Sequence, residues 1–356
     1  MKSLATPHGV LDLPTFLPDA TWGVVRALDG LDVAACGIQA LMVNVLHLAD
    51  GPGTQRVAAL GGIHRFMGWS GAVACDSGGF QVYSLIAAGG KRGHVSDEGF
   101  SYTTEGSRRK RVLTPEKCVR KQFELGGDIL FCLDHCTHPS ADLEHQRLSV
   151  DHTVAWAQRC KVEFMRLVEA QPGEAGTPLL FSVVQGGRDR DLRRECAERL
   201  AEMGFDGFGF GGWPIADNGA LVDEVGLVAE LMPRGTPLHA LGIGKPENVR
   251  AAFRMGYSLF DCTLPTRDAR HRRLYVLSDE TDLGYLTINI GDERFARDPG
   301  SIDDGCDCAT CRTCSKAYLH YLFEIRDLSA SRLATLHNLR TFARLMDRLR
   351  ETESDG

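Results

Sequence analysis

The sequence predicts an α/β fold: a closed (β/α)8 barrel, or TIM barrel, followed by a small C-terminal unit. Three observations predict it. Short apolar runs bounded by turn residues recur along the chain, the stretches between them repeat apolar residues every three or four positions, and eight such runs can be counted. The length of 356 residues suits one large barrel. An open doubly wound sheet is the alternative, which the number of runs disfavours.

Each apolar run has the length of a strand and leaves room for a helix before the next one. Helices are expected over residues 115–125, 149–168, 192–203 and 218–231, where the apolar spacing is helical. The expected strands, in chain order, are Leu13–Leu17, Ile38–Val45, Ala72–Cys75, Ile129–Leu133, Leu179–Val184, Gly207–Phe210, Leu238–Ile243 and Leu259–Asp261.

The pattern changes after the eighth run. A turn-rich and cysteine-rich stretch, 299–314, precedes two expected helices over 316–325 and 328–349. The second helix carries one apolar face, formed by Leu333, Leu336, Leu339, Phe342 and Met346. We therefore expect a catalytic barrel over residues 1–298 and an appended subdomain over 299–350, merged with the last helix of the barrel.

Composition excludes several classes of protein. With 43% hydrophobic and 24% charged residues, the chain is neither disordered, collagen-like nor a coiled coil. No apolar run approaches the ~20 residues of a membrane-spanning helix, and residues 1–9 lack a signal-peptide core, so we expect a cytoplasmic protein without membrane contact. A net charge of −7 argues against a generic nucleic-acid binder, although residues 108–111 and 267–273 form two local basic patches.

Polar residues and glycines follow the expected strands at their carboxyl ends. In a closed barrel these ends meet on one face, which is where active sites of this fold lie. The sequence therefore predicts one site built from carboxylates, amides and flexible backbone. Its members are Asn44, Asp76, Asp134, Gln185, Gly211 with Gly212, Gly242 with Gly244, and Asp261.

Three of the twelve cysteines are spaced for a metal ion. Cys306, Cys308 and Cys311 form a C-x-C-x-x-C pattern, which brings three thiolates to one ion without long-range folding and suits tetrahedral zinc. His337 on the next amphipathic helix, Cys314 and His320 are rivals for the fourth position. Unligated buried cysteines are the alternative, and the other cysteines are expected to be reduced core thiols. Four protein ligands leave no position for water, so the predicted zinc is structural.

The segment from Asp76 to Phe80 suits a heterocyclic ligand. Its glycine pair lets backbone approach a ligand, and Phe80 offers a flat apolar face for stacking. Taken alone, the segment is better interpreted as a tight turn capped by Asp76 or Ser77, with Phe80 in the core.

Two further strand ends could recognise a purine. The Asp134 carboxylate can accept hydrogen bonds from two N–H groups of a guanine-like edge, and Gln185 with the backbone N–H of Gly212 suits a carbonyl. Separately, each of these is an ordinary turn or cap.

Asp261 ends the eighth run and stands just before Arg267 and Arg270, which are candidate phosphate contacts. Carboxylates are competent nucleophiles at an anomeric carbon, and two of them permit a double displacement that retains configuration. A salt-bridged surface aspartate is the alternative, but it does not explain a carboxylate at the end of a buried strand.

Several strings of residues resemble one known family, the tRNA-guanine transglycosylases, in particular the bacterial type. CDCATC from Cys306, with a histidine 26 residues after Cys311, resembles the zinc subdomain of that family. The resemblance covers essentially the whole chain from Thr6. The other strings are DSGGFQVYSL from Asp76, DHCTHP from Asp134, VVQGG around Gln185, GFGGW ending at Trp213, LGIGKP from Leu241 and LFDCTLPTR from Leu259.

The resemblance implies a base exchange in the queuosine pathway, in which a guanine of the tRNA anticodon is replaced by a 7-deazaguanine. It implies that Asp261 attacks ribose C1′ and holds the RNA covalently, and that Asp76 handles the protons. No cofactor other than structural zinc is implied, and a homodimer is expected. By the same resemblance, Ser77, Phe80, Asp134, Gln185 and Gly212 bind the base, Arg267 and Arg270 contact RNA, and Cys306, Cys308, Cys311 and His337 bind the zinc.

The sequence departs from the family pattern beside the expected base. Trp213-Pro214 stands where bacterial members usually carry Leu-Ala, and Asp217 stands where they carry Glu. The larger ring should reshape the pocket around the 7-substituent. Ile215 and Cys136 are bulky enough to disfavour queuine, which favours preQ1 as the incoming base. Two alternatives remain: a paralogue that inserts a 7-deazaguanine into DNA, and a non-catalytic RNA-binding partner subunit, against which the presence of both Asp76 and Asp261 argues.

Overall fold

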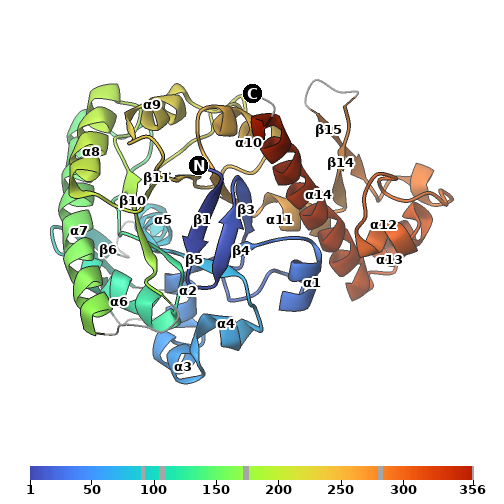
Figure 1. Ribbon diagram of the computed structural model, residues 1–356, viewed down its shortest axis with the longest axis horizontal. Coiled ribbons are helices and arrows are strands. Elements are labelled where there is room, and N and C mark those ends of the chain that lie inside the picture. The colour runs from blue at the N-terminus through green and yellow to red at the C-terminus, as the bar shows by residue number, and fades with distance from the viewer. Residues whose placement is uncertain (90–92, 104–109, 171–175, 280–283, 355–356) are drawn as a thin grey trace.

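The computed structural model describes residues 1–89, 93–103, 110–170, 176–279 and 284–354. Eight parallel strands form one sheet in the order β4-β5-β9-β10-β11-β12-β13-β3. A parallel bridge between Asp19 and Met42, with Ala20 N–H donating to Met42 O over 2.7 Å, joins its two ends and closes it. The predicted (β/α)8 barrel is confirmed (Figure 1). Its strands are β3 (Thr15–Pro18), β4 (Ala40–Asn44), β5 (Ala72–Asp76), β9 (Ile129–Phe131), β10 (Leu179–Val184), β11 (Gly207–Phe210), β12 (Leu238–Ala240) and β13 (Leu259–Cys262).

Each predicted apolar run overlaps one strand of the barrel, and the differences lie at the ends. The first strand begins at Thr15 and not at Leu13, because Pro14 has no N–H for the ladder. The seventh ends at Ala240 and not at Ile243, because Gly242, with φ of 74°, turns the chain into the loop that follows.

The expected helices surround the barrel (Figure 1). Helix α6 (Pro115–Leu125) has the predicted bounds because the Thr114 side chain accepts the N–H of Lys117 at its start and Gly126 adopts a left-handed conformation at its end. Helix α9 (Asp223–Leu231) begins five residues later than expected, because Ile215 and Leu221 pair across a turn. The other helices of the barrel layer are α1 (Gly30–Ala35), α2 (Val45–Asp50), α3 (Thr54–Ala59), α4 (Gly62–Met67), α5 (Gly79–Gly89), α7 (Leu143–Ala170), α8 (Arg190–Met203), α10 (Pro246–Arg254) and α11 (Leu264–Arg270).

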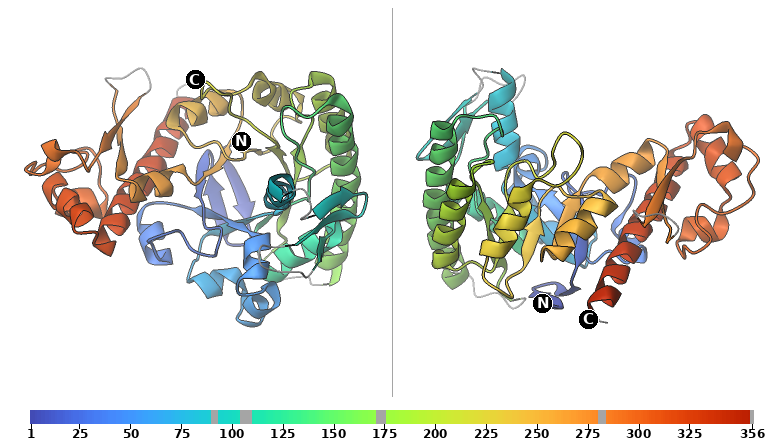
Figure 2. Two further views of the ribbon diagram at one scale, coloured as in Figure 1. Left: turned by 180° about the vertical axis from the view of Figure 1, so that it is seen from behind. Right: turned by 90° about the horizontal axis from the view of Figure 1, so that it is seen from above.

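Two small antiparallel sheets lie at opposite ends of the barrel. The hairpin of β1 (Ser3–Thr6) and β2 (Gly9–Asp12) places Leu4 and Leu11 in one core cluster with the inward side chains Phe131 and Phe181, so it plugs the amino end (Figure 2). At the carboxyl end stand β6 (Gly93–Ser96), β7 (Gly99–Tyr102) and β8 (Arg111–Leu113). The barrel is therefore open to ligands on its carboxyl side.

The C-terminal elements project from one side of the barrel (Figure 2). Both helices expected here are present, although Leu333 is only partly buried while Leu336, Leu339, Phe342 and Met346 lie in the core. A separate core cluster runs from Ala269 to Ala334. The elements are β14 (Arg273–Leu277), β15 (Tyr285–Asn289), the 3-10 helix η1 (Glu293–Phe295), α12 (Ala309–Thr313), α13 (Lys316–Glu324) and α14 (Leu328–Ser354).

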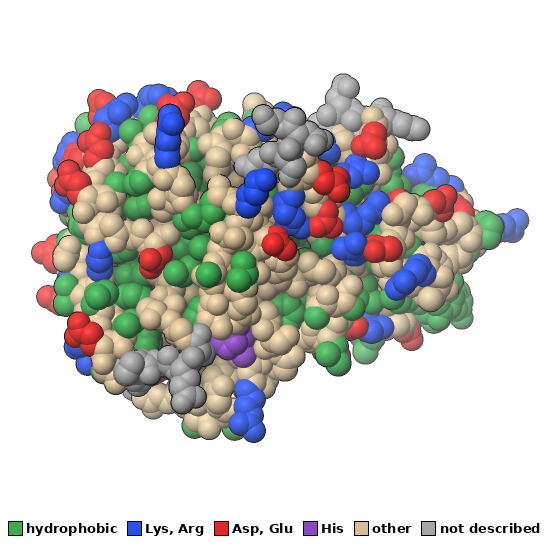
Figure 3. All heavy atoms as spheres, viewed as in Figure 1, with side chains coloured by type: hydrophobic (Ala, Val, Ile, Leu, Met, Phe, Trp, Pro, Cys, Tyr) green, Lys and Arg blue, Asp and Glu red, His purple; other side chains and the backbone are tan. Residues whose placement is uncertain are grey.

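Helix α14 joins the projecting elements to the barrel. It contacts α11 and β3 on one side and α12, α13 and β14 on the other. Basic and acidic side chains are interspersed on the face of the molecule in Figure 3, and three arginines of α14 pair with aspartates of other segments. Arg340 pairs with Asp307 at 2.6 Å and Arg344 with Asp303 at 2.7 Å, so two of its arginines hold the cysteine-rich loop.

Within the described residues, no helix combines the length and the apolarity that spanning a bilayer would require. Of the first basic patch, Arg108 and Arg109 lie outside the described residues, whereas Arg111 pairs with Asp50. All twelve cysteines are described, and each is a free thiol.

Candidate active site and metal centre

A cavity of about 460 Å³ opens at the carboxyl end of the barrel. The strands bring nearly all the predicted strand-end residues together in the wall of this cavity, with the exception of Gly244. Ser77 does not line the cavity itself but contacts Asp134, which does. The members that line it are Asn44, Asp76, Asp134, Gln185, Gly211, Gly212, Gly242 and Asp261, and the predicted stacking residue Phe80 joins them.

Asp261 is the third residue of β13, and one of its carboxylate oxygens accepts two hydrogen bonds from the protein. Its Oδ1 accepts a hydrogen bond from His239 Nε2 at 2.9 Å and from the N–H of Gly242 at 3.2 Å. Among the described residues, Oδ2 has no hydrogen-bond partner, and the side chain is 19% exposed. One oxygen therefore orients the carboxylate and the other is available to a ligand.

His239 was not predicted. It is fully buried on β12, and its Nδ1 has no partner among the described residues. A carboxylate oxygen cannot donate, so Nε2 carries a proton and donates it to Asp261. The only signal in the sequence is a polar residue inside the apolar run that begins at Leu238.

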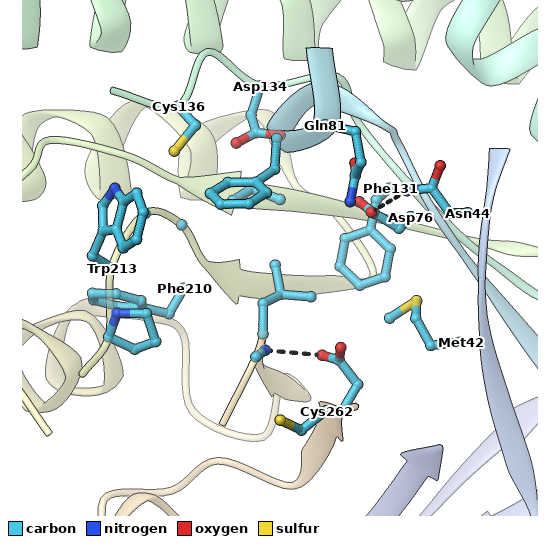
Figure 4. Close-up of a pocket in the computed structure, with 18 of the residues that line it drawn as sticks. Met42, Asn44, Asp76, Gln81, Phe131, Asp134, Cys136, Phe210, Trp213 and Cys262 are labelled. Carbon is cyan, nitrogen blue, oxygen red and sulfur yellow. Dashed lines mark hydrogen bonds between the residues drawn. The ribbon is translucent and has the colours of Figure 1, made fainter. Parts of the chain in front are cut away.

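Asp76 lies across the same cavity at the end of β5. Its Oδ2 accepts a hydrogen bond from Asn44 Nδ2 at 2.6 Å, and Gln81 lies beside it (Figure 4). The pKa of Asp76 is raised to about 6, chiefly by burial and then by the negative charge of Asp261, while hydrogen bonds from Asn44, Gly78 and Gln81 oppose the rise. A carboxyl group with such a pKa can both release and accept a proton near neutral pH.

Asp134 is the third carboxylate of the cavity. Its Oδ2 accepts from Gln185 Nε2 at 2.6 Å, and Ser77 Oγ lies 3.5 Å from its Oδ1. The pKa of Asp134 is raised to about 6, mainly by burial, while the hydrogen bond from Gln185 opposes the rise. A Cβ at Gly211 would come within 2.5 Å of Gln185 Nε2, which explains the glycine. Asp134 and Gln185 thus form a hydrogen-bonding wall.

Aromatic rings form the outer wall. Phe80 and Trp213 stand edge to face with their ring centroids 5.7 Å apart, and the His138 ring centroid lies 5.5 Å from that of Trp213. Trp213 and Cys136 face the cavity in Figure 4. Because Phe80 is 41% and Trp213 39% exposed, a flat ligand could still cover both rings.

The two predicted RNA contacts lie at the rim, on α11. Arg267 is exposed, and Arg270 donates to Thr266 O over 2.8 Å. Burial lowers the pKa of Arg270, and the nearby positive charges of Arg26 and Arg267 lower it further. Arg26, Arg267 and Arg270 are therefore close enough to influence one another electrostatically, and Asp19 partly offsets their charge.

The cysteine cluster gains its fourth member from α14. One ligand atom each of Cys306, Cys308, Cys311 and His337 lies within 4.8 Å of the others, a set that can hold a metal ion. His337 Nδ1 is 3.2 Å from Cys311 Sγ. His337 Nε2 donates to Tyr275 O over 2.7 Å, which leaves Nδ1 as the free lone pair. Cys314 and His320 are not in this group.

Comparison with known proteins agrees with this architecture. The profile of a family described as queuine tRNA-ribosyltransferase matches residues 1–356. The queuine tRNA-ribosyltransferase of Solidesulfovibrio magneticus is 37% identical over 354 residues, which cover 99% of this chain and 90% of the relative. Those of a Thermoanaerobacter species and of Syntrophobacter fumaroxidans are 37% and 38% identical, each over 98% of this chain and 88% of the relative.

These similarities show that the chain is an enzyme of the pentosyltransferase class. More closely, it belongs to the queuine tRNA-ribosyltransferase family, and the resemblance found in the sequence is confirmed.

Proposed function

We propose that the protein exchanges a guanine of a tRNA anticodon for a 7-deazaguanine through a covalent intermediate on Asp261. The observation that carries this proposal is the pair of carboxylates, Asp76 and Asp261, facing one cavity of about 460 Å³. Membership of the family supports tRNA as the substrate.

In the first displacement, Asp261 Oδ2 attacks C1′ of the ribose as the bond from C1′ to N9 of guanine breaks. The hydrogen bonds from His239 and Gly242 hold the other oxygen, which becomes the carbonyl oxygen of the ester. Asp76 supplies a proton to the departing base. Its carboxylate then takes the corresponding proton from the incoming base, whose nitrogen attacks C1′ and releases Asp261.

The base lies between the aromatic wall and the hydrogen-bonding wall. Asp134 accepts from the two N–H groups of the guanine-like edge, while Gln185 and the N–H of Gly212 face its carbonyl. Ser77 supports Asp134, and Phe80 stacks on the ring.

The favoured incoming base is preQ1. Trp213, Ile215 and Cys136 line the cavity and leave less room for a bulky substituent at position 7. An aminomethyl cation can lie against the Trp213 ring through a cation–π contact. If this is correct, replacing Trp213 by Leu lowers the preference for preQ1 over preQ0 and queuine in exchange assays; an unchanged preference would refute the assignment.

The bound metal is zinc in this proposal, held by Cys306, Cys308, Cys311 and His337. Three thiolates and an imidazole are a donor set of structural zinc sites, and four protein ligands exclude water from the ion. The ion would tie the cysteine-rich loop to α14 and contribute folding energy.

We further propose that the enzyme is a homodimer in the cytoplasm. Free thiols throughout the chain fit a reducing compartment. Exposed apolar side chains follow one another along α13 and into α14, at Tyr318, Tyr321, Ile325 and Leu328. In sedimentation experiments, Tyr321→Glu should shift the protein towards the monomer, whereas Val162→Glu, a change of an exposed apolar residue on α7, should not.

The central experiment tests which nucleic acid is the substrate and whether Asp261 is the nucleophile. The protein is incubated with labelled guanine and either tRNA or duplex DNA, and label is expected in tRNA alone. Asp261→Asn should abolish a denaturant-resistant RNA adduct, while Asp151→Asn, an exposed control on α7, should keep it. Survival of the adduct in Asp261→Asn, or label in DNA, would overturn the proposal.

A further inference from the structure

A second histidine of the C-terminal elements has the geometry of a metal ligand. His320 on α13 is 2% exposed, and its Nδ1 lies 2.8 Å from Ile290 O. A carbonyl oxygen cannot donate, so Nδ1 carries a proton, and Nε2 is the ring atom that remains to bind a ligand. His337 in the cysteine cluster is fixed by a backbone carbonyl in the same way.

The lone pair of His320 is directed at carboxylates. Its Nε2 has no hydrogen-bond partner among the described residues, and Glu324 Oε1, one helical turn further along α13, lies 3.4 Å away. Glu293 on η1 supplies a third ligand atom, the second carboxylate oxygen, and the three ligand atoms lie within 4.8 Å of one another. A buried acceptor that faces acceptors is unfavourable unless a cation lies between them.

The distance of 3.4 Å between Nε2 and Oε1 favours a metal ion as that cation. It is longer than an ordinary N–H···O hydrogen bond. Two ligands of a tetrahedral ion with bonds of about 2.0–2.1 Å are themselves about 3.3–3.4 Å apart. Imidazole and carboxylate oxygens suit a divalent transition ion such as Zn²⁺ or Co²⁺.

A second histidine-containing group, His8, His64 and Asp128, lacks the geometry of a metal site. His8 Nδ1 and His64 Nε2 lie 2.8 Å and 3.0 Å from the two oxygens of Asp128, which also accepts from the N–H of Val73. The imidazole rings stack with centroids 3.5 Å apart. These nitrogens already have hydrogen-bond partners, and two parallel stacked rings cannot both direct their in-plane lone pairs at one ion. That group carries no metal site.

We propose that His320, Glu324 and Glu293 form a second divalent-cation site, independent of the cysteine cluster, which ties η1 to α13. Three protein ligands leave room for water, so the ion at this site exchanges more readily than one held by the cysteines. Its role is to fix the segment between β15 and the cysteine-rich loop.

The test is a Co²⁺ titration of the full-length protein after dialysis against a chelator, followed by absorption spectroscopy and calorimetry. Binding of Co²⁺ at the cysteine cluster produces a thiolate charge-transfer band. The wild type should bind one further equivalent that adds nothing to this band. His320→Gln, Glu324→Gln and Glu293→Gln should each weaken the further equivalent by at least about ten-fold.

Glu169→Gln, an exposed change of the same charge on α7, is the matched control and should bind like the wild type. Glu324→Gln and Glu293→Gln keep the buried contact between His320 and Ile290, so they test the site without disturbing the core. A wild type that binds no Co²⁺ beyond the cysteine cluster would overturn the proposal. The proposal would also be overturned if any one of the three variants bound the further equivalent of Co²⁺ as tightly as the wild type.

Discussion

Replacing Asp76 by Asn should stabilise the protein at neutral pH. Burial and the charge of Asp261 raise the pKa of Asp76 from its usual 3.8 to about 6. Between these two values the folded protein keeps a proton that the unfolded chain has released, so the free energy of unfolding falls as the pH rises through this window. Above the folded pKa, the full penalty of holding the buried carboxylate is present.

The size of the effect follows from the shift. About two pKa units at about 1.4 kcal/mol each give roughly 3 kcal/mol at pH 7.5 and about half of that at pH 5. Asn has no charge to bury and can still accept from Asn44. The variant should therefore unfold at higher urea concentration than the wild type at pH 7.5, with a smaller gain at pH 5.

Equilibrium urea unfolding at both pH values, followed by circular dichroism, measures this directly. Asp151→Asn, an exposed change of the same charge, should move the midpoint little at either pH. A destabilised Asp76→Asn at pH 7.5, or a gain that does not depend on pH, would refute the electrostatic reasoning. The variant should also lose base exchange, because Asp76 handles the protons in the proposed reaction.

Three further perturbations are expected to act on separate parts of the site. His239→Leu removes a hydrogen bond to the charged Asp261, worth about 1.5–3 kcal/mol, so adduct formation should slow by roughly ten-fold or more in rapid-quench assays while base binding persists. Gly211→Ala should displace the Gln185 amide and raise the KM for the base by on the order of ten-fold; an unchanged KM would contradict this. Cys308→Ser should release the bound metal, measured by elemental analysis, and lower Tm; full metal content would count against the ligand set.

The barrel could be predicted because its signals are local. Each strand is a continuous apolar run, since both faces of a parallel strand are buried, and the polar residue that ends the run sits where the strands converge. For this reason Asp76, Asp134 and Asp261 could be assigned to one face before any tertiary contact was known.

Contacts between distant segments could not be predicted in this way. The pairing of Asn44 with Asp76 and of His239 with Asp261 depends on which strands are neighbours. His239 is also hidden inside an apolar run, where a buried histidine resembles an ordinary core position. The plug formed by β1 and β2 depends on the same long-range packing.

The choice of the fourth cysteine-cluster residue shows the same limit. By spacing alone, Cys314, His320 and His337 were rivals, and only the resemblance to the family favoured His337. The physical reason is the course of α14, which carries His337 to the cysteines, and the contact of His320 with Ile290, which turns that ring elsewhere.

The packing of β3 against α14 has a consequence for how the chain folds. β3, near the start of the sequence, is held by α14 more than 300 positions later: Phe16 packs on Phe342 with ring centroids 4.8 Å apart, and Arg350 Nη1 donates to Pro14 O over 2.6 Å. Contacts of such high sequence separation form late and slowly. During synthesis, β3 cannot make these contacts until α14 has been made.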